Sequence, residues 1–272
     1  MTHSRPAIRA LLDSRSLAPR RDLGQNFVAD PNTVRRIADL ARVGAGDRVV
    51  EIGAGLGSLT LALADTGADV TAIEIDRGVV PVLREVVADR SNVTVLEGDA
   101  MSLDWHDLLA DRHPAGTGPS GTDTADTAAP DDQGWVLVAN LPYNVATPLV
   151  CDLLDDVPGI GRMIVMVQRE AAERVAAAPR TPAYGAVSVK GAYWATARIV
   201  GHVPASVFVP RPNVESSLVE ITRHEPPATD AHRVFELVRT AFGQRRKMLR
   251  KSLAGVLDPE TFAAAGIDPT AR

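Results

Sequence analysis

Five short apolar runs between residues 48 and 168 most strongly limit the folds open to this 272-residue chain. The central ones are nearly continuous in Val, Ile and Leu, and helical stretches separate the runs. The runs are Arg48–Gly53, Asp69–Asp76, Asn92–Asp99, Trp135–Asn140 and Arg162–Gln168. Such strands are typical of a mostly parallel sheet that helices cover on both faces. Two later segments, around Val187–His202 and at Ser216–Arg223, bring the predicted α/β sheet to about seven strands.

Helical signals stand on both sides of this region. Asp30-Pro31 is a capping residue followed by proline at the first helical position, which predicts a helix of about 12 residues. After the break at Pro226-Pro227 we expect two helices with basic residues, Ala231–Phe242 and Gly243–Leu257. The chain is therefore divided into a large α/β domain over residues 1–224 and a small helical domain over residues 225–272.

Composition limits the remaining segments and the compartment. Residues 113–134 consist almost wholly of Gly, Pro, Ala, Thr and Asp, which predicts a disordered surface loop. A lone cysteine, Cys151, allows no internal disulfide and fits a reducing cytoplasm. The chain has no run of about 18 uncharged apolar residues, and its arginine-rich start lacks the apolar core of a signal peptide. We expect a cytoplasmic protein that does not span a membrane.

The first candidate binding site is the run Glu51-Ile-Gly53-Ala-Gly55-Leu-Gly57, between a predicted strand and a helix at Leu59–Asp65. Glycines at such a turn let the backbone approach a ligand and point helix N–H groups toward it. A dinucleotide site usually has the spacing G-x-G-x-x-G. The spacing here is G-x-G-x-G with an acid two residues before it, which favours a nucleoside that carries an amino acid.

Two further carboxylates end the next two predicted strands. Glu74 lies 21 residues after Gly53 and can accept hydrogen bonds from both hydroxyls of a ribose. Asp99, in Gly98-Asp99-Ala100, can hold the exocyclic amine of a bound adenine. Either one alone could be a solvated loop residue. Because the carboxyl ends of adjacent parallel strands meet where open α/β sheets bind ligands, we assign both to the cofactor.

The fourth strand runs into Asn140-Leu141-Pro142-Tyr143, which predicts the chemistry. An exocyclic aromatic amine is a poor nucleophile because its lone pair is delocalised into the ring. The Asn140 side-chain oxygen and the Leu141 carbonyl can each accept one N–H bond of such an amine, while Pro142 makes the loop rigid. Tyr143 offers a face for a flipped-out base, although an ordinary turn would also use Asn and Pro. We see no His/Asp or Cys/His arrangement and assign no metal site.

In this order the motifs resemble those of the ribosomal RNA adenine dimethyltransferases. The resemblance runs from about residue 22 to 257 and includes three more motifs. They are Gly24-Gln25-Asn26-Phe27, Phe208-Val-Pro210-Arg-Pro212-Asn-Val214-Glu-Ser216 and Ala241-Phe242-Gly-Gln244-Arg245-Arg246-Lys247. It implies a seven-stranded, Rossmann-like methyltransferase sheet that uses S-adenosylmethionine, with a small helical C-terminal domain.

The resemblance also implies roles for single residues. Asn26 and the backbone of Val28, where the family more often has Leu, would close over the cofactor, and Phe208 would stack on the target adenine opposite Tyr143. The implied cofactor-binding residues are Gln25, Asn26, Val28, Gly53, Gly55, Gly57, Glu74, Asp99, Ala100 and Asn140. The loop before Trp135 departs from the family pattern as an insertion.

The continuation Asn144-Val-Ala-Thr147-Pro148 resembles the housekeeping bacterial branch of the family. That branch methylates two adjacent adenines in the 3′-terminal hairpin of 16S rRNA, in the small (30S) ribosomal subunit or its precursor. The first alternative is the macrolide-resistance branch, which acts on large-subunit rRNA. A second alternative is a DNA adenine or protein-glutamine methyltransferase. DNA methyltransferases of this kind normally carry a large domain that reads the DNA sequence, and about 50 residues after Pro226 leave little room for one. A third is a non-catalytic ribosome assembly factor that binds the RNA through the same surface.

A net charge of −5 does not exclude RNA binding, because a local basic patch is sufficient. On one continuous helix Arg246, Lys247, Arg250 and Lys251 would gather on one side, with Met248, Leu249 and Leu253 facing inward. These predicted RNA-binding residues are Arg245, Arg246, Lys247, Arg250 and Lys251. A weaker second candidate is the N-terminal set of Arg5, Arg9, Arg15, Arg20 and Arg21. No heptad suggests an obligate partner, so we expect a monomer.

Overall fold

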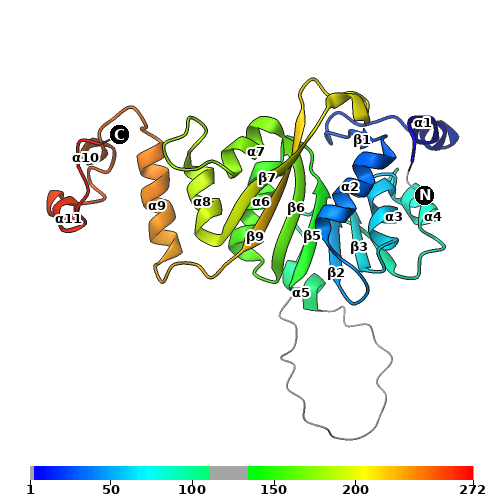
Figure 1. Cartoon of the computed structure of the whole chain (residues 1–272), viewed down its shortest axis with the longest axis horizontal. Helices are drawn as coiled ribbons and strands as arrows, with labels where there is room; N and C mark the ends of the chain where they lie inside the picture. Colours follow the sequence, from blue (N-terminus) through cyan, green and yellow to red (C-terminus); the bar gives the residue numbers. More distant parts are fainter. Residues whose placement is uncertain (1–2, 111–133, 272) are drawn as a thin grey trace, which may run out of the picture.

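The computed structural model describes residues 3–110 and 134–271. Its centre is a seven-stranded sheet with the strand order β4-β3-β2-β5-β6-β9-β7 (Figure 1). The strands are β2 (Arg48–Ile52), β3 (Asp69–Glu74), β4 (Val93–Glu97), β5 (Trp135–Asn140), β6 (Ile160–Gln168), β7 (Ala195–Val203) and β9 (Ser216–Arg223). The first five are parallel, and β9 is antiparallel to both β6 and β7. The predicted seven-stranded α/β sheet is confirmed. The predicted loop at 113–134 lies, apart from Gly134, outside the described residues.

Helices bury an apolar layer on each face of the sheet. On one face α2 (Pro31–Ala41) and α3 (Ser58–Ala64) cover the sheet, and on the other α6 (Ala146–Asp156) and α7 (Arg169–Val175) do so. Two more helices flank the sheet, α4 (Val80–Val86) and α5 (Trp105–Ala110). The predicted start of α2 is confirmed, because the Asp30 carboxylate accepts the Thr33 N–H at 2.9 Å.

The N-terminal chain packs beside the first glycine turn. Helix α1 (Arg5–Ser14) buries Ile8 and Leu12 against Phe27 and Leu56. The chain then forms strand β1 (Phe27–Val28), which pairs with β8 (Phe208–Val209) in a small second sheet. A 3-10 turn, η1 (Ala205–Val207), precedes β8. The β1–β8 pair joins segments 180 residues apart at the edge of the main sheet where β2, β3 and β5 end.

The segment at Val187–His202 was predicted wrongly as strand throughout. Its first part is helix α8 (Ala186–Trp194), and β7 begins only at Ala195. The apolar run Ala186–Lys190 has alternating valines that are equally compatible with a short strand. The helix buries Ser188, Gly191 and Tyr193, and the Ser188 hydroxyl donates to the Arg174 carbonyl at 2.6 Å, a tertiary contact that no local pattern shows.

The continuous helix predicted at Gly243–Leu257 was also wrong. The chain turns after α9 (Ala231–Phe242), Met248 is extended, and only a short helix, α10 (Leu249–Ser252), follows. The first N–H groups of α10 donate to the C-terminal chain, Leu249 to the Ala271 carbonyl and Arg250 to that of Pro269. These bonds replace the ones that a continuous helix would make back to residues 245 and 246.

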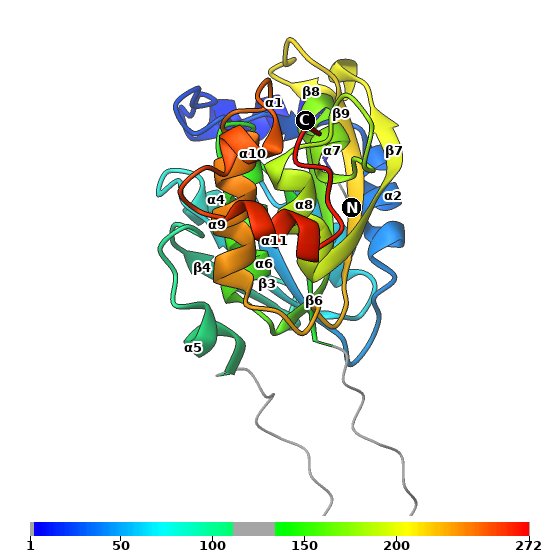
Figure 2. The ribbon, with the colours of Figure 1, turned by 90° about the vertical axis from the view of Figure 1, so that its left-hand side faces the viewer.

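Helices α9, α10 and α11 (Pro259–Ala264) lie at one end of the molecule, beyond α8, and α1 lies at the other (Figures 1 and 2). Helix α9 is attached through aromatic contacts, since the rings of Tyr193 and Phe235 lie 5.1 Å apart. The Tyr193 hydroxyl donates to the Thr229 carbonyl at 2.8 Å. The boundary proposed at residue 225 stays a prediction. Among residues 3–110 and 134–271 no helix is long and apolar enough to cross a membrane.

Candidate functional site

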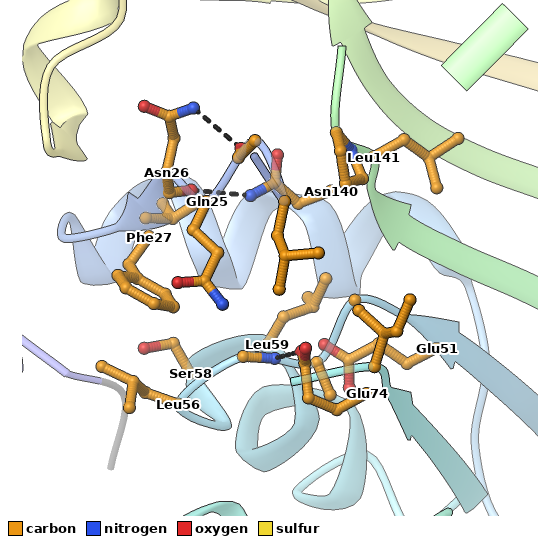
Figure 3. Close-up of a pocket in the computed structure, with 18 of the residues that line it drawn as sticks. Gln25, Asn26, Phe27, Glu51, Leu56, Ser58, Leu59, Glu74, Asn140 and Leu141 are labelled. Carbon is orange, nitrogen blue, oxygen red and sulfur yellow. Dashed lines mark hydrogen bonds between the residues drawn. The ribbon is translucent and has the colours of Figure 1, made fainter. Parts of the chain in front are cut away.

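Two adjoining hollows lie where β2, β3, β4 and β5 end, at the edge of the sheet that parallel α/β folds use for ligands. The first is about 860 Å³, open to solvent, and is drawn in Figure 3. Both are lined by Leu23, Gly53, Ile75 and Pro142, so they form one continuous trough. We call this pair of hollows the trough.

The trough brings together most of the residues singled out in the sequence. Gln25, Asn26, Val28, Gly53, Gly55, Glu74, Asn140, Leu141, Pro142 and Tyr143 line the first hollow. Asp99 and Ala100 line the second. Gly57 and Phe208 line neither of them. Five segments that are distant in the sequence therefore meet in one place.

The glycine turn after β2 needs its glycines for backbone geometry. Gly53, Gly55 and Gly57 have φ values of +73°, +55° and +82°, in the left-handed region. A Cβ on Gly55 would lie 3.1 Å from the Phe27 ring, and one on Gly57 would lie 3.0 Å from Leu83 in α4. Gly57 thus begins α3 and permits close packing, although it does not line the trough.

Glu74 is held in place by two backbone groups. Its carboxylate accepts the Gly55 N–H at 2.7 Å and the Asp76 N–H at 2.9 Å, one on each oxygen. A carboxylate has about four acceptor positions, so each oxygen keeps room for one more donor. Burial raises the pKa of Glu74 above its usual range. The arrangement can accept two neighbouring hydroxyl groups.

The end of the trough beside Gly98 has the features of a binding site for a planar base. Ile75 and Met101 line it and are 45% and 46% exposed, which is unusual for large apolar side chains. Asp99 lies beside them, and one of its oxygens accepts the Met101 N–H at 2.9 Å. Apolar side chains and a carboxylate together suit an aromatic ring that bears an amine. With Glu74 and the glycine turn, the residues present fit S-adenosylmethionine.

Two more acidic residues take part in the site: Glu51, the first residue of the glycine run, and Asp76, which the sequence did not single out and which contacts the site through Gln25. Glu51 lines the trough, is 1% exposed and accepts the Thr60 hydroxyl at 2.6 Å. Burial raises the pKa of Glu51 to about 8, so its carboxyl group is protonated at neutral pH. Asp76, at the end of the run that forms β3, accepts the Gln25 side-chain N–H at 2.7 Å. The sequence showed Glu51 as the acid two residues before Gly53 but gave it no separate role. No local sequence pattern indicated the bond between Gln25 and Asp76.

Asn140 is oriented by the backbone of Asn26. Its Nδ2 donates to the Asn26 carbonyl oxygen at 3.0 Å (Figure 3). A carbonyl can only accept, so the Asn140 atom that faces it must be the amide nitrogen. The Asn140 side-chain oxygen is therefore left to accept a hydrogen bond. Asn26 itself donates from its side chain to the Gly24 carbonyl at 3.0 Å, which tightens the same turn.

The two aromatic residues predicted to hold a base are placed differently. Tyr143 lines the trough and is half-buried, with its hydroxyl 2.8 Å from that of Ser216. Phe208 is only 1% exposed and packs in the core with Val28 and Ile37. The expectation that Phe208 faces Tyr143 across a base is not met here, because the Phe208 ring is buried in the core and lines neither hollow. The order of motifs along the sequence does not indicate whether the Phe208 side chain points into the site or into the core.

The five cations predicted to bind RNA are all exposed, but not on one helix. Arg245, Arg246 and Lys247 lie in the turn after α9, and Arg250 and Lys251 in α10. Arg245 donates to the Tyr184 carbonyl at 2.8 Å. At the other end of the molecule, three of the N-terminal arginines already have partners. Arg5 donates to Ser206, and Arg15 and Arg20 pair with Glu85 and Asp22.

Comparison with known proteins agrees with this geometry. The family model described as ribosomal RNA adenine dimethylase matches residues 17–272. A protein of Cutibacterium acnes named ribosomal RNA small subunit methyltransferase A is 46% identical, over 98% of this chain and 87% of its own. A protein of the same name from Nocardia farcinica is 45% identical, over 97% and 88%.

Two solved structures share the fold. A dimethyladenosine transferase from Plasmodium falciparum superposes with a TM-score of 0.66 at 26% identity, over 82% of this chain and 73% of its own. The 23S rRNA methyltransferase ErmE superposes with a TM-score of 0.63 over 91% and 93%, and its 24% identity supports likeness of fold alone.

The glycine turn yields a prediction for ligand binding. Gly55→Ala puts a side chain in the left-handed region, at a cost of about 1–2 kcal/mol, and brings its Cβ to the Phe27 ring. We expect affinity for S-adenosylmethionine, measured by calorimetry, to fall at least about tenfold. Gly46→Ala is the matched control, because Gly46 has φ +93° and a Cβ added there would have no atom within 4 Å. Equal affinity in the two variants would contradict the assignment of this turn.

Proposed function

Because this chain belongs to the ribosomal RNA adenine dimethylase family, we propose that it dimethylates N6 of two adjacent adenines in the 3′-terminal hairpin of 16S rRNA. The chain is an S-adenosylmethionine-dependent rRNA methyltransferase, as the family match over residues 17–272 requires. The choice of the small subunit is supported by the names of the relatives at 46% and 45% identity and by the Asn144–Pro148 motif.

The orientation of Asn140 is the observation that supports the reaction best. S-adenosylmethionine supplies a methyl group on a positively charged sulfur, so the amine needs correct placement more than a strong base. The Asn140 oxygen, left over from the bond to Asn26, accepts one N6–H of the adenine. The Leu141 carbonyl accepts the other. Drawing both protons toward acceptors in the plane localises the nitrogen lone pair toward the methyl group.

The residues around the trough bind and orient the cofactor in this proposal. Glu74 accepts the two ribose hydroxyls with the oxygen positions that the backbone leaves free. Asp99 takes the amine of the cofactor's adenine, between Ile75 and Met101. Pro142 keeps the loop rigid, and its carbonyl accepts the Val145 and Ala146 N–H groups at the start of α6. Tyr143 provides a stacking face for the target base.

We further propose that the chain acts as a cytoplasmic monomer on the 30S subunit or its precursor. The lone Cys151 is buried, which fits a reducing compartment. The exposed large apolar residues among those described are Ile75, Met101, Val214 and Ile267. Ile75 and Met101 line the trough, so these residues offer no broad apolar surface for a second subunit.

The substrate assignment is tested by mass analysis of the modified nucleoside. The protein is incubated with labelled S-adenosylmethionine and, in parallel, with small subunits that lack adenine methylation, large subunits and duplex DNA. We expect N6,N6-dimethyladenosine in the small subunit alone. Label in large-subunit RNA would move the chain to the resistance-type branch, and label in DNA would overturn the RNA assignment. Intact cofactor binding without transfer would favour an assembly factor.

The role of Asn140 is tested by Asn140→Ala. Without its amide, one acceptor for the target amine is lost, and we expect the transfer rate to fall by at least about 100-fold. Affinity for S-adenosylmethionine, measured by calorimetry, should fall far less. If the variant retains full turnover, Asn140 does not position the amine.

The cation cluster is tested by the salt dependence of RNA binding. Replacing Arg250 and Lys251 by glutamine removes two exposed charges on α10, whereas replacing Arg35 and Arg84 removes two exposed charges on α2 and α4. We expect the first pair to lower the slope of log affinity against log salt by about 1.4–1.8, with cofactor binding intact. The control pair should leave that slope unchanged. Equal slopes in the two double variants would rule out contact through α10.

A further inference from the structure

Tyr143 is tied at its far end to a residue outside the loop that carries it. Its hydroxyl lies 2.8 Å from the Ser216 hydroxyl, although the two residues are 73 positions apart. Ser216 begins β9 and has an exposed fraction of 0%. A loop residue that lines the trough is thus connected directly to the central sheet.

Ser216 is a rigid anchor for this bond. In the sheet it lies opposite Gln168 of β6 on one side and Val203 of β7 on the other. A strand paired on both sides cannot shift without breaking two ladders of hydrogen bonds. Burial also removes water as a competing partner for the Ser216 hydroxyl, which strengthens its preference for Tyr143.

The bond matters because of where Tyr143 lies. The ring lines the trough three residues after Asn140, and Phe208 is turned into the core. The phenol group is neutral at physiological pH, because the ordinary pKa of tyrosine is about 10 and burial raises the pKa of Tyr143 further, so it can donate to Ser216. Without that partner the phenol would be drawn toward solvent, because a half-buried hydroxyl seeks a hydrogen bond.

We propose that Ser216 is a positioning residue for methyl transfer, whose hydroxyl holds the Tyr143 ring in the place where the target adenine stacks. This inference rests on the proposed function, because stacking on Tyr143 is part of it. Ser216 itself touches neither base nor cofactor. It acts on the geometry of the amine beside Asn140 through the placement of the ring.

The next residue provides a matched control. Ser217 has the same exposed fraction of 0%, but its hydroxyl lies 3.0 Å from Nδ1 of His202. Successive residues of a strand point to opposite faces, so Ser217 is directed away from Tyr143. Ser217→Ala therefore removes an equally buried hydroxyl on the same strand without touching the proposed contact.

The test is a double-mutant cycle read in kcat. Ser216→Ala and Tyr143→Phe remove the same hydrogen bond from its two ends. We expect each to lower kcat for transfer to unmethylated small subunits about two- to tenfold. Affinity for S-adenosylmethionine should stay within about twofold of the wild-type value. The double variant should be no slower than the slower single variant, because nothing further is lost.

Two more variants separate positioning from folding. Ser216→Thr keeps the hydroxyl and should restore most of kcat, and Ser217→Ala should keep kcat unchanged. Wild-type kcat in Ser216→Ala, or multiplying effects in the double variant, would overturn the proposal. If Ser216→Ala does not fold, Tyr143→Phe still removes the bond, and an unchanged kcat there overturns it. Absence of dimethyladenosine from the wild-type protein would instead contradict the proposed function.

Discussion

The hydrogen bond from the Asn140 side chain to the Asn26 carbonyl holds the site together. It joins a turn near the N-terminus to the end of β5, across 114 positions of sequence. Because the bond uses the amide nitrogen, the side-chain oxygen is the atom of Asn140 that is left to accept a further hydrogen bond. The β1–β8 pair, the Gln25–Asp76 bond and the packing of α1 on Leu56 hold the Asn26 side of the contact in place. The N-terminal segment therefore helps to fix the position of Asn140 in the trough.

Burial and local hydrogen bonds set the protonation state and orientation of the polar groups in the trough. Glu74 is fixed by two backbone N–H groups and keeps acceptor capacity, whereas Glu51 is protonated and accepts a hydrogen bond from Thr60. Burial is the main cost of a charged Glu51 and the charge of Glu74 adds to it, so protonation of Glu51 relieves both costs. Groups already aimed where charge and hydrogen-bond donors will appear need no rearrangement during the reaction. The same logic applies to Tyr143 and its anchor, Ser216.

The sequence predicted the parts of the fold that local pattern controls. The apolar runs marked the strands, Asp30-Pro31 marked the start of α2, and the glycines marked the turn that needs positive φ. The sequence-based predictions were wrong where contacts between distant segments determine the secondary structure. The run Ala186–Trp194 forms a helix that packs against α6, α7 and α9, and α10 is short because the C-terminal chain binds its first N–H groups. The direction of Phe208 and the partners of Asp76 and Tyr143 likewise depend on residues far away in the sequence, which one sequence does not place.

A crystal structure with S-adenosylmethionine and adenosine bound tests the role of Asn140 most directly. We expect the Asn26 carbonyl still to accept the Asn140 amide N–H. The Asn140 oxygen and the Leu141 carbonyl should then both face N6 of the adenosine, with the two ribose hydroxyls of the cofactor on Glu74. An Asn140 side chain turned away from N6, or bonded to the ligand through its nitrogen, would contradict that role.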